Sequence, residues 1–268
     1  MAETVAGTPG VPEYEISARS PKCGRALVGV PVLNEGERIR EQLRRMGREL
    51  DLEQLDADVV IADGGSTDGA LTDDVLDQAG VRAVLTKRGP GRMSAQLRML
   101  FHWAIEQGYD HVVTIDGNGK DGLPGIGRVL GALRNGFDFV QGSRYIAGGV
   151  AVNTPRSRHL GVKLVHAPVL SLGARHRYTD TTNGLRGWST RALADPRVAP
   201  LRDEFVGYEL HYYLTVRIPR LGYRVTEVPV TRAYPDEGRT PTKITGLKPK
   251  VAIVGEVLKA AAGRYEPS

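Results

Sequence analysis

The sequence predicts an α/β protein, in which a mostly parallel sheet is flanked by helices and forms a single domain. Up to about residue 140, short runs rich in Val and Ile alternate with amphipathic segments, which is typical of a parallel sheet wrapped by helices. Hydrophobic residues make up 41% of the chain and charged residues 25%, the usual balance of a globular protein. With 268 residues, the chain is long enough to bury one large core.

Five short apolar segments are the expected strands, because each is rich in apolar residues and ends in polar or glycine-rich sequence. These segments are 25–33, 57–62, 81–85, 111–115 and 137–141. The expected helices between them are 35–50, 71–78, 94–107 and 123–135. In the first helix, Ile39, Leu43 and Met46 recur at helical spacing between charged residues. Later in the chain the pattern weakens, and the expected elements are helices at 159–172 and 208–221 and a strand at 224–230.

Composition divides the chain into three parts. Residues 1–24 lack the apolar core of a signal peptide and are expected to form a flexible leader. Residues 25–245 are expected to form the domain, with a nucleotide half at 25–145 and an acceptor half at 146–245. Residues 246–268 are expected to form a basic helix and tail that packs against the domain, with contact to an anionic membrane surface as the alternative.

The charge of the chain favours a phosphorylated partner. A net charge of +5 and a pI near 9.3 suit nucleic acid, anionic lipid or phosphorylated small molecules. Aromatic residues make up 6% and are not interleaved with the basic ones, so a nucleic-acid surface is not expected. The single cysteine, Cys23, excludes an internal disulfide and a cysteine-based zinc site. No apolar run reaches the length of a membrane span, and the expected location is the cytoplasm, with contact at the inner face of the membrane left open.

Polar or glycine-rich segments follow four successive strands, at 31–35, 63–68, 87–92 and 116–121. The carboxyl ends of parallel strands meet at one edge of a sheet, where ligands of such folds gather. Carboxylates there can accept hydrogen bonds from a base or ribose, glycines let the backbone approach, and Lys or Arg can meet a diphosphate. The four segments together predict a nucleotide site at this edge.

These segments also carry a family resemblance. VPVLNE, ADGGSTDG, KRGPGRMSAQLRM and TIDGNGKD resemble, in order, blocks of the family 2 glycosyltransferases of the GT-A fold. The match is to the dolichol-phosphate mannosyltransferase-like branch, the polyprenyl-phosphate sugar synthases. Later blocks follow in the same order, namely GSRYIAGG, TDTTNGLRGWS, GYELHYYL, LGYRVTEVPV and GRTPTKI. The resemblance covers residues 25–248 and implies a Rossmann-like GT-A fold and an inverting sugar transfer from a nucleotide-diphosphate sugar.

The resemblance implies a donor site in the first half of the chain. The nucleobase is expected near Pro31, Glu35 and Asp63, and the diphosphate near Arg92 and Asp116. The full set of expected donor-binding residues is Pro31, Asn34, Glu35, Asp63, Gly65, Ser66, Lys87, Gly91, Arg92, Asp116, Gly117 and Asn118.

A divalent cation, Mg²⁺ or Mn²⁺, is the expected cofactor, because these ions prefer oxygen ligands and offset charge on a leaving diphosphate. The expected ligands are Asp116, Asn118 and Asp121. Asn118 stands where the family has a second Asp, and Lys120 could contact the diphosphate directly, so the requirement for metal stays open.

The resemblance also implies an acceptor site. Arg144 and Arg158 match the pair that grips the acceptor's phosphate, a task suited to the planar fork of arginine. Asn183, Arg186 and Lys243 are the other expected acceptor-binding residues.

Asp116, Asp180 and Glu209 are the expected catalytic residues, with Asp180 facing the sugar and Glu209 as general base for a hydroxyl acceptor. The expected acceptor is a polyprenyl phosphate. Val162 replaces a serine of the family, which keeps the hydroxyl of a soluble glycan or secondary metabolite as an alternative.

Two other classes of protein are alternatives to a glycosyltransferase. A sugar-phosphate nucleotidyltransferase would carry a glycine-rich loop with a basic end after its first strand, and VPVLNEGER is not such a loop. A non-catalytic nucleotide-sugar-binding protein stays open, because Asn118 and Lys120 depart from the family's metal motif.

Overall fold

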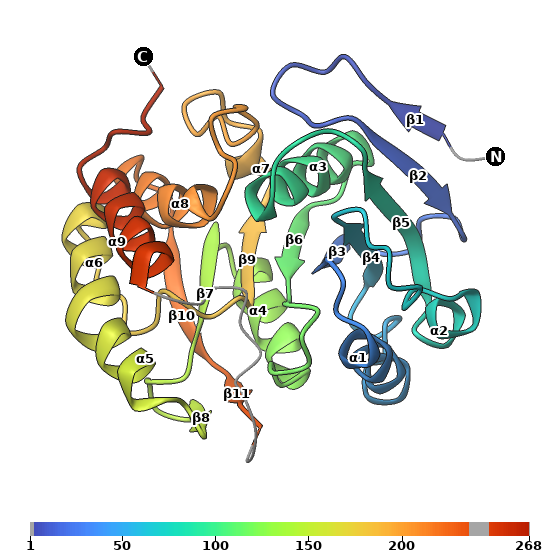
Figure 1. Cartoon of the computed structure of the whole chain (residues 1–268), viewed down its shortest axis with the longest axis horizontal. Helices are drawn as coiled ribbons and strands as arrows, with labels where there is room; N and C mark the ends of the chain where they lie inside the picture. Colours follow the sequence, from blue (N-terminus) through green and yellow to red (C-terminus); the bar gives the residue numbers. More distant parts are fainter. Residues whose placement is uncertain (1–2, 236–246, 268) are drawn as a thin grey trace.

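The computed structural model describes residues 3–235 and 247–267, and it contains a sheet of nine strands in the order β1-β2-β5-β4-β3-β6-β9-β7-β10 (Figure 1). The strands are β1 (Glu3–Val5), β2 (Tyr14–Ala18), β3 (Ala26–Val32), β4 (Ala57–Asp63), β5 (Val81–Lys87), β6 (His111–Thr114), β7 (Phe139–Ser143), β9 (Arg186–Ser189) and β10 (Val225–Pro229). A separate parallel pair is formed by β8 (Val150–Val152) and β11 (Thr231–Ala233).

The centre of the sheet consists of the parallel strands β5, β4, β3 and β6. Every residue of β3 and β4 is buried, as expected for parallel strands covered on both faces. β9 lies antiparallel between β6 and β7, and β10 is parallel to β7. The α/β prediction is confirmed, and the carboxyl ends of β4, β3 and β6 are neighbours at one edge.

Helices cover both faces of the sheet and form a three-layer arrangement. One face packs against α1 (Glu37–Glu49), α2 (Asp73–Gln78) and α4 (Pro124–Arg134) in one hydrophobic cluster. In α1, Ile39, Leu43 and Met46 are buried, as their spacing predicts. The other face packs against α3 (Met93–Glu106), α6 (Ala167–Ala174) and α8 (Glu209–Arg220).

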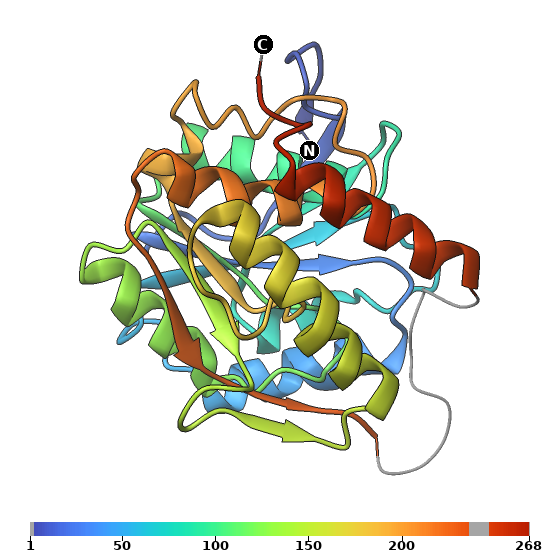
Figure 2. The ribbon, with the colours of Figure 1, turned by 90° about the vertical axis from the view of Figure 1, so that its left-hand side faces the viewer.

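The second half of the chain adds one long helical segment and the C-terminal helix. The long segment comprises α5 (Arg156–Gly161), a π-helical stretch η1 (Val162–His166) and α6, and the short α7 (Thr190–Leu193) follows β9. α9 (Leu247–Ala261) lies beside α6 and α8 (Figure 2). At the crossing with α6, a Cβ on Gly173 would lie 2.6 Å from Ala261 Cα, so a glycine is needed there. In the described part of the chain, none of the helices has the length and apolar character needed to cross a bilayer.

The N-terminal residues differ from the expectation of a flexible leader over residues 1–24. β2 pairs antiparallel with β5, and β1 pairs with β2, so this segment extends the sheet. Tyr14 is buried and shares a 3.1 Å hydrogen bond with His102 Nδ1. The segment is held by backbone pairing, by the buried Tyr14 and by ion pairs such as that of Arg19 with Asp73, and not by an apolar run, which is why the sequence pattern missed it.

Candidate active site

The loops after β3 and β4 are joined to one another. The backbone N–H of Asn34 donates to Ser66 Oγ over 3.0 Å, and the N–H of Thr67 donates back to Asn34 Oδ1 over 2.8 Å. The N–H of Gly36 donates to Asp68 Oδ2 over 2.8 Å. The two loops therefore form one rim, and the expected donor residues Asn34 and Ser66 belong to it.

Asp63 ends β4 at this rim. Its Oδ1 accepts hydrogen bonds from the N–H of Ser66 at 2.9 Å and from Ser66 Oγ at 2.6 Å. Gly65 takes a φ of 90°, a conformation that favours glycine. Lys87, at the end of the neighbouring β5, is half-buried, and burial lowers the pKa of its ammonium against the opposing field of Asp63. Asp63, Gly65, Ser66 and Lys87 thus lie together, as expected.

Gln96 connects the ends of two strands below the rim, and the sequence analysis missed it. Its Nε2 donates to the carbonyl of Val32 over 2.7 Å and to the carbonyl of Ala62 over 2.8 Å. The residue is buried on α3. A glutamine among the mostly apolar residues of this helix was the signal that could have identified it.

Gly91 and Arg92 lead into α3. A Cβ on Gly91, which has a φ of 101°, would lie 2.5 Å from the Ala95 Cβ. Arg92 is exposed, and its backbone N–H donates to the carbonyl of Val206 over 2.9 Å. The start of α3 is thereby tied to the segment that precedes α8.

Asp116 follows β6 and lies against the loop before β9. A Cβ on Gly184 would lie 2.7 Å from Asp116 Oδ2 and closer still to Oδ1. Thr114 Oγ1 donates to the carbonyl of Gly184 over 3.1 Å. A Cβ on Gly117 would lie 3.0 Å from the carbonyl of Pro31. Asp116 therefore joins the rim formed after β3, and its neighbouring expected residues Pro31 and Gly117 meet there.

The two other expected metal ligands are engaged inside the protein. Asn118 Nδ2 donates to Asp116 Oδ2 over 3.3 Å, and Asn118 Oδ1 accepts from the N–H of Lys120 over 3.3 Å. The side chain of Asp121 is fully buried, and both its oxygens accept from Arg232 Nη1, at 2.8 and 2.7 Å. Asp121 thus faces an arginine of β11, a residue that the sequence analysis did not single out.

Arg232 also contacts Asp116. Its Nη2 donates to Asp116 Oδ2 over 3.0 Å. Burial raises the pKa of Asp116, but the charge and hydrogen bond of Arg232 outweigh burial, and the pKa lies below its usual value. Asp116 is therefore held as a carboxylate.

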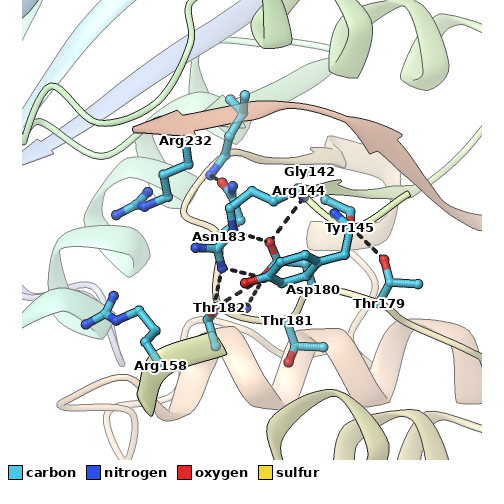
Figure 3. Close-up of polar contacts among 12 residues, drawn as sticks. Gly142, Arg144, Tyr145, Arg158, Thr179, Asp180, Thr181, Thr182, Asn183 and Arg232 are labelled. Carbon is cyan, nitrogen blue, oxygen red and sulfur yellow. Dashed lines mark hydrogen bonds and ion pairs between the residues drawn. The ribbon is translucent and has the colours of Figure 1, made fainter. Parts of the chain in front are cut away.

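Arg144 and Asp180 form a buried ion pair (Figure 3). Arg144 Nε donates to Asp180 Oδ2 over 2.6 Å, and Nη2 donates to Asp180 Oδ1 over 2.9 Å and to Thr182 Oγ1 over 2.8 Å. Both charged side chains have an exposed fraction of 0%. Arg144 therefore faces Asp180 inside the protein in this structure, and the expected roles of Arg144 in acceptor binding and of Asp180 in facing the sugar stay predictions.

Arg158 lies in a group of positive charges around one tyrosine. Arg158 Nη1 donates to the Tyr234 hydroxyl over 2.9 Å, and its guanidinium lies 5.5 Å from the ring centroid. Lys120 Nζ and the Arg232 guanidinium lie 5.4 and 5.9 Å from the same centroid. Burial raises the pKa of Tyr234, but the nearby arginines outweigh this effect and lower it. We call Lys120, Arg158 and Arg232 the basic cluster.

Arg186 and Asn183 support the loop before β9 from inside. The Arg186 guanidinium is buried and donates to the carbonyls of Asn183, at 2.9 Å, and Thr181, at 2.7 Å. Burial lowers the pKa of Arg186 to about 10. Asn183 Oδ1 accepts from the N–H of Leu185 over 2.9 Å. Both side chains are buried and bond to the protein, and their expected role in acceptor binding stays a prediction. Lys243, the last expected acceptor residue, lies outside the described residues.

Glu209 begins α8, and its carboxylate accepts from the N–H of Gly207 over 2.5 Å. The pKa of the preceding Tyr208 is shifted by charges from several parts of the site. Burial raises the pKa of Tyr208, the charge of Asp116 raises it further, and the charges of Arg92 and Arg158 oppose the rise. Tyr208 therefore lies within electrostatic reach of the donor rim and of the basic cluster, and the sequence analysis did not predict it.

The chain is similar in sequence to curated proteins and similar in fold to solved structures. No model of a known protein family matches the chain. It is 29% identical over 248 residues to an undecaprenyl-phosphate mannosyltransferase of Micrococcus luteus. This match covers 90% of this chain and 96% of the relative. The chain is 29% identical over 216 residues to a polyprenol monophosphomannose synthase of Mycolicibacterium smegmatis, covering 77% of each chain.

Solved structures of glucosyl-3-phosphoglycerate synthase from Mycobacterium tuberculosis share the fold. One holds Mn²⁺, uridine diphosphate and glucosyl-3-phosphoglycerate, with 19% identity, a TM-score of 0.61, and coverage of 91% of this chain and 81% of that one. Another holds Mg²⁺ and uridine diphosphate, with 20% identity, a TM-score of 0.60 and coverage of 91% and 80%.

The chain therefore has the fold of glycosyltransferase structures of the GT-A class, and it is similar in sequence to curated glycosyltransferases. Within that class, the curated relatives named above are polyprenyl-phosphate mannosyltransferases, as the resemblance of the sequence blocks predicted.

Proposed function

We propose that the chain transfers a sugar from a nucleotide-diphosphate sugar to the phosphate of a polyprenyl phosphate, with inversion at the sugar. The observation that carries this proposal is the position of Asp116, which adjoins the donor rim through Gly117 and the basic cluster through Arg232. A donor diphosphate and an anionic acceptor would then meet beside one carboxylate. The names of the curated relatives support the choice of acceptor.

The donor rim offers the groups that a nucleotide needs. Asp63 ends its strand beside Gly65, and carboxylates at such positions accept hydrogen bonds from a base or ribose. The charge of Arg92 lowers the pKa of Tyr208, whereas the charge of Asp116 raises it, so both charges act on the same tyrosine. We assign the nucleobase to the side of Asp63 and the diphosphate to the side of Arg92.

The residues present fit a divalent cation at Asp116. Its Oδ2 takes part in hydrogen bonds, whereas its Oδ1 makes none to a described residue and faces Gly184, which has no side chain. Within residues 3–235 and 247–267, no group of three or more His, Cys, Asp or Glu side chains is placed to hold a metal ion. The cation would therefore rely on Asp116 and on the diphosphate oxygens, and it would offset charge on the leaving diphosphate.

The basic cluster suits an acceptor phosphate. Arg158 lies beside Tyr234 with Lys120 close to the same ring, so several cations converge on one place. A phosphate oxygen is already an anionic nucleophile and needs no general base. It forms the new bond to the anomeric carbon, and the bond to the diphosphate breaks on the opposite side, with its electron pair leaving on the nucleoside diphosphate.

A hydroxyl acceptor receives less support from the geometry. Such an acceptor needs a base to take its proton, and Glu209 is the residue expected for that role. The Glu209 carboxylate instead accepts the N–H of Gly207 at the start of α8. This contact stabilises the start of α8 and engages one of the two carboxylate oxygens.

The proposal also includes contact between the α5–α6 segment and a membrane surface. Leu160, Leu164 and Leu172 have exposed fractions of 54%, 70% and 83%, and all three lie along the one helical segment from α5 to α6. Arg158 lies on the same segment. A lipid whose phosphate reaches Arg158 would therefore leave its chain beside an exposed apolar face.

A transfer assay tests the proposed reaction. The purified chain is incubated with radiolabelled UDP-, GDP- or dTDP-sugars and undecaprenyl phosphate in detergent micelles, and label in the organic phase is counted. We expect label in an acid-labile lipid product with one donor, and a loss of at least tenfold with Arg158→Met. Transfer to a glycan hydroxyl but not to the lipid phosphate would show that the acceptor assignment is wrong.

A further inference from the structure

The Arg232 guanidinium lies where a metal-binding motif would place a cation. It forms two hydrogen bonds with Asp121 and one with Asp116, at distances from 2.7 to 3.0 Å. Asp116 and Asp121 come from the turn after β6, whereas Arg232 comes from β11, far along the chain. A positive charge carried by the protein itself therefore bridges two acids of the expected metal motif.

The two halves of this bridge are unequal. Asp121 has a side chain with 0% exposure and offers both oxygens to one nitrogen of Arg232, so this contact is fixed inside the protein. Asp116 has a side chain that is 23% exposed and shares a single hydrogen bond with Arg232. Breaking the Asp116 contact costs less, because water and incoming cations can reach that carboxylate.

The backbone holds Arg232 in place. The N–H of Gly122 donates to the carbonyl of Thr231 over 2.9 Å, and the N–H of Ala233 donates to the carbonyl of Lys120 over 2.9 Å. These bonds flank Arg232 on both sides and form a short antiparallel bridge between residues 121 and 232. The contact between Arg232 and the two acids is therefore part of the fold and not a chance position of a surface side chain.

We propose that Arg232 is a built-in counter-ion of Asp116, which competes with a divalent cation for this carboxylate and yields it when nucleotide diphosphate is bound. Arg232 keeps its two hydrogen bonds to Asp121 in both states, so Asp121 anchors the arginine and is not a metal ligand. The inference rests on the proposed function for the role of the nucleotide. Its consequence is that the unliganded protein binds divalent cations weakly.

The test is a titration of Mn²⁺, in which free Mn²⁺ is measured by electron paramagnetic resonance, without any sugar donor. The double variant Arg232→Met with Asp121→Leu removes both members of the buried pair and leaves Asp116 without its competitor. We expect this variant to bind Mn²⁺ about tenfold more tightly than the wild type, which corresponds to about 1.4 kcal/mol. If Asp121 is instead a metal ligand, the same variant binds Mn²⁺ more weakly, and the proposal is overturned.

Two further variants serve as controls for the Mn²⁺ affinity. Arg232→Lys keeps the positive charge and is expected to bind Mn²⁺ as weakly as the wild type. Arg128→Met removes an exposed arginine that donates to the carbonyl of Pro229, and it is expected to leave the Mn²⁺ affinity unchanged.

A measurement on the wild type tests the same proposal if the double variant does not fold. Uridine or guanosine diphosphate, whichever binds, is expected to raise the Mn²⁺ affinity of the wild type at least tenfold. Equally tight Mn²⁺ binding with and without nucleotide would overturn the proposal. Because no sugar is transferred in these titrations, their outcome is separate from that of the transfer assay.

Discussion

The contact between Gly184 and Asp116 makes one backbone position decisive for the site. Gly184→Ala places a methyl group on the Asp116 carboxylate, which must then shift. Displacing a reacting group by about 1 Å can cost roughly 100-fold in rate, and we expect a fall of about that size in kcat/KM for sugar transfer. Gly131→Ala is the matched control, because a Cβ at Gly131 on α4 meets nothing within 4 Å. Equal activity of the two variants would contradict the assignment of Asp116.

The buried pair of Arg144 and Asp180 makes stability depend on pH. Burial raises the pKa of Asp180, but the hydrogen bonds from Arg144 outweigh it, so the folded pKa lies below the unfolded value of about 3.9. The pair therefore stabilises the fold above about pH 4, and this contribution is lost as the pH falls through the folded pKa.

Asp180→Asn leaves the Arg144 charge buried and is expected to lower the free energy of unfolding by about 3 to 5 kcal/mol at pH 7. Urea denaturation at pH 7, 5 and 3.5 measures the difference, which should be constant between pH 7 and 5 and smaller at 3.5. Asp73→Asn, at an exposed ion pair with Arg19, serves as the control and is expected to change little. A difference that does not change with pH would refute the assigned pairing.

The sequence identified the residues that follow strands but not the partners that come from far along the chain. Asp63 and Asp116 each end a recognisable apolar run, so their shared edge could be predicted. Arg232 and Asp116 are 116 positions apart, and no local pattern links them. The resemblance singled out Arg144, as a partner of Arg158, and Asp180 separately, but it did not indicate that Arg144 and Asp180 form an ion pair with one another.

At the scale of elements, the α5–α6 segment is the part of the chain that we expect to contact a membrane surface. Burying a leucine side chain contributes about 1.5 to 3 kcal/mol, so replacing two should lower binding to vesicles at least tenfold. We expect the variant Leu164→Gln with Leu172→Gln to sediment poorly with phosphatidylglycerol vesicles, whereas the wild type sediments with them. Val206→Gln, at an exposed apolar residue outside this segment, is the control and should behave as the wild type. Unchanged sedimentation of the double variant would rule out this face as the contact.

Elements were predictable where periodicity was strong. Most of the helices between the central strands, and α8 later on, were found because apolar residues recur every three or four positions. β9 was missed because its four residues, RGWS, are too short to show alternation, and Gly187 in it is required by the close approach of Val129 and Leu133. β2 was missed because its backbone pairing with β5 leaves no clear mark in the side-chain pattern.

At the scale of the whole molecule, ligand binding should raise thermal stability. A nucleotide diphosphate that binds the folded state adds about 2.7 kcal/mol at a concentration 100 times its Kd. For a domain of this size that amounts to a rise in Tm of roughly 5 to 10 °C. We expect one of the UDP-, GDP- and dTDP-sugars to produce this rise, measured by differential scanning fluorimetry, and Asp63→Ala to reduce it. If no nucleotide shifts the Tm, the donor assignment is wrong.

Hydrogen bonds at Ser94 connect the start of α3 to the start of α8. The N–H and Oγ of Ser94 both donate to the carbonyl of Gly207, at 2.8 and 2.9 Å. Ser94 Oγ also accepts the N–H of Leu210 over 3.3 Å. These bonds join residues 25–145, expected to form the nucleotide half, to residues 146–245, expected to form the acceptor half. A hinge motion that separates α3 from α8 would have to break these three hydrogen bonds at Ser94.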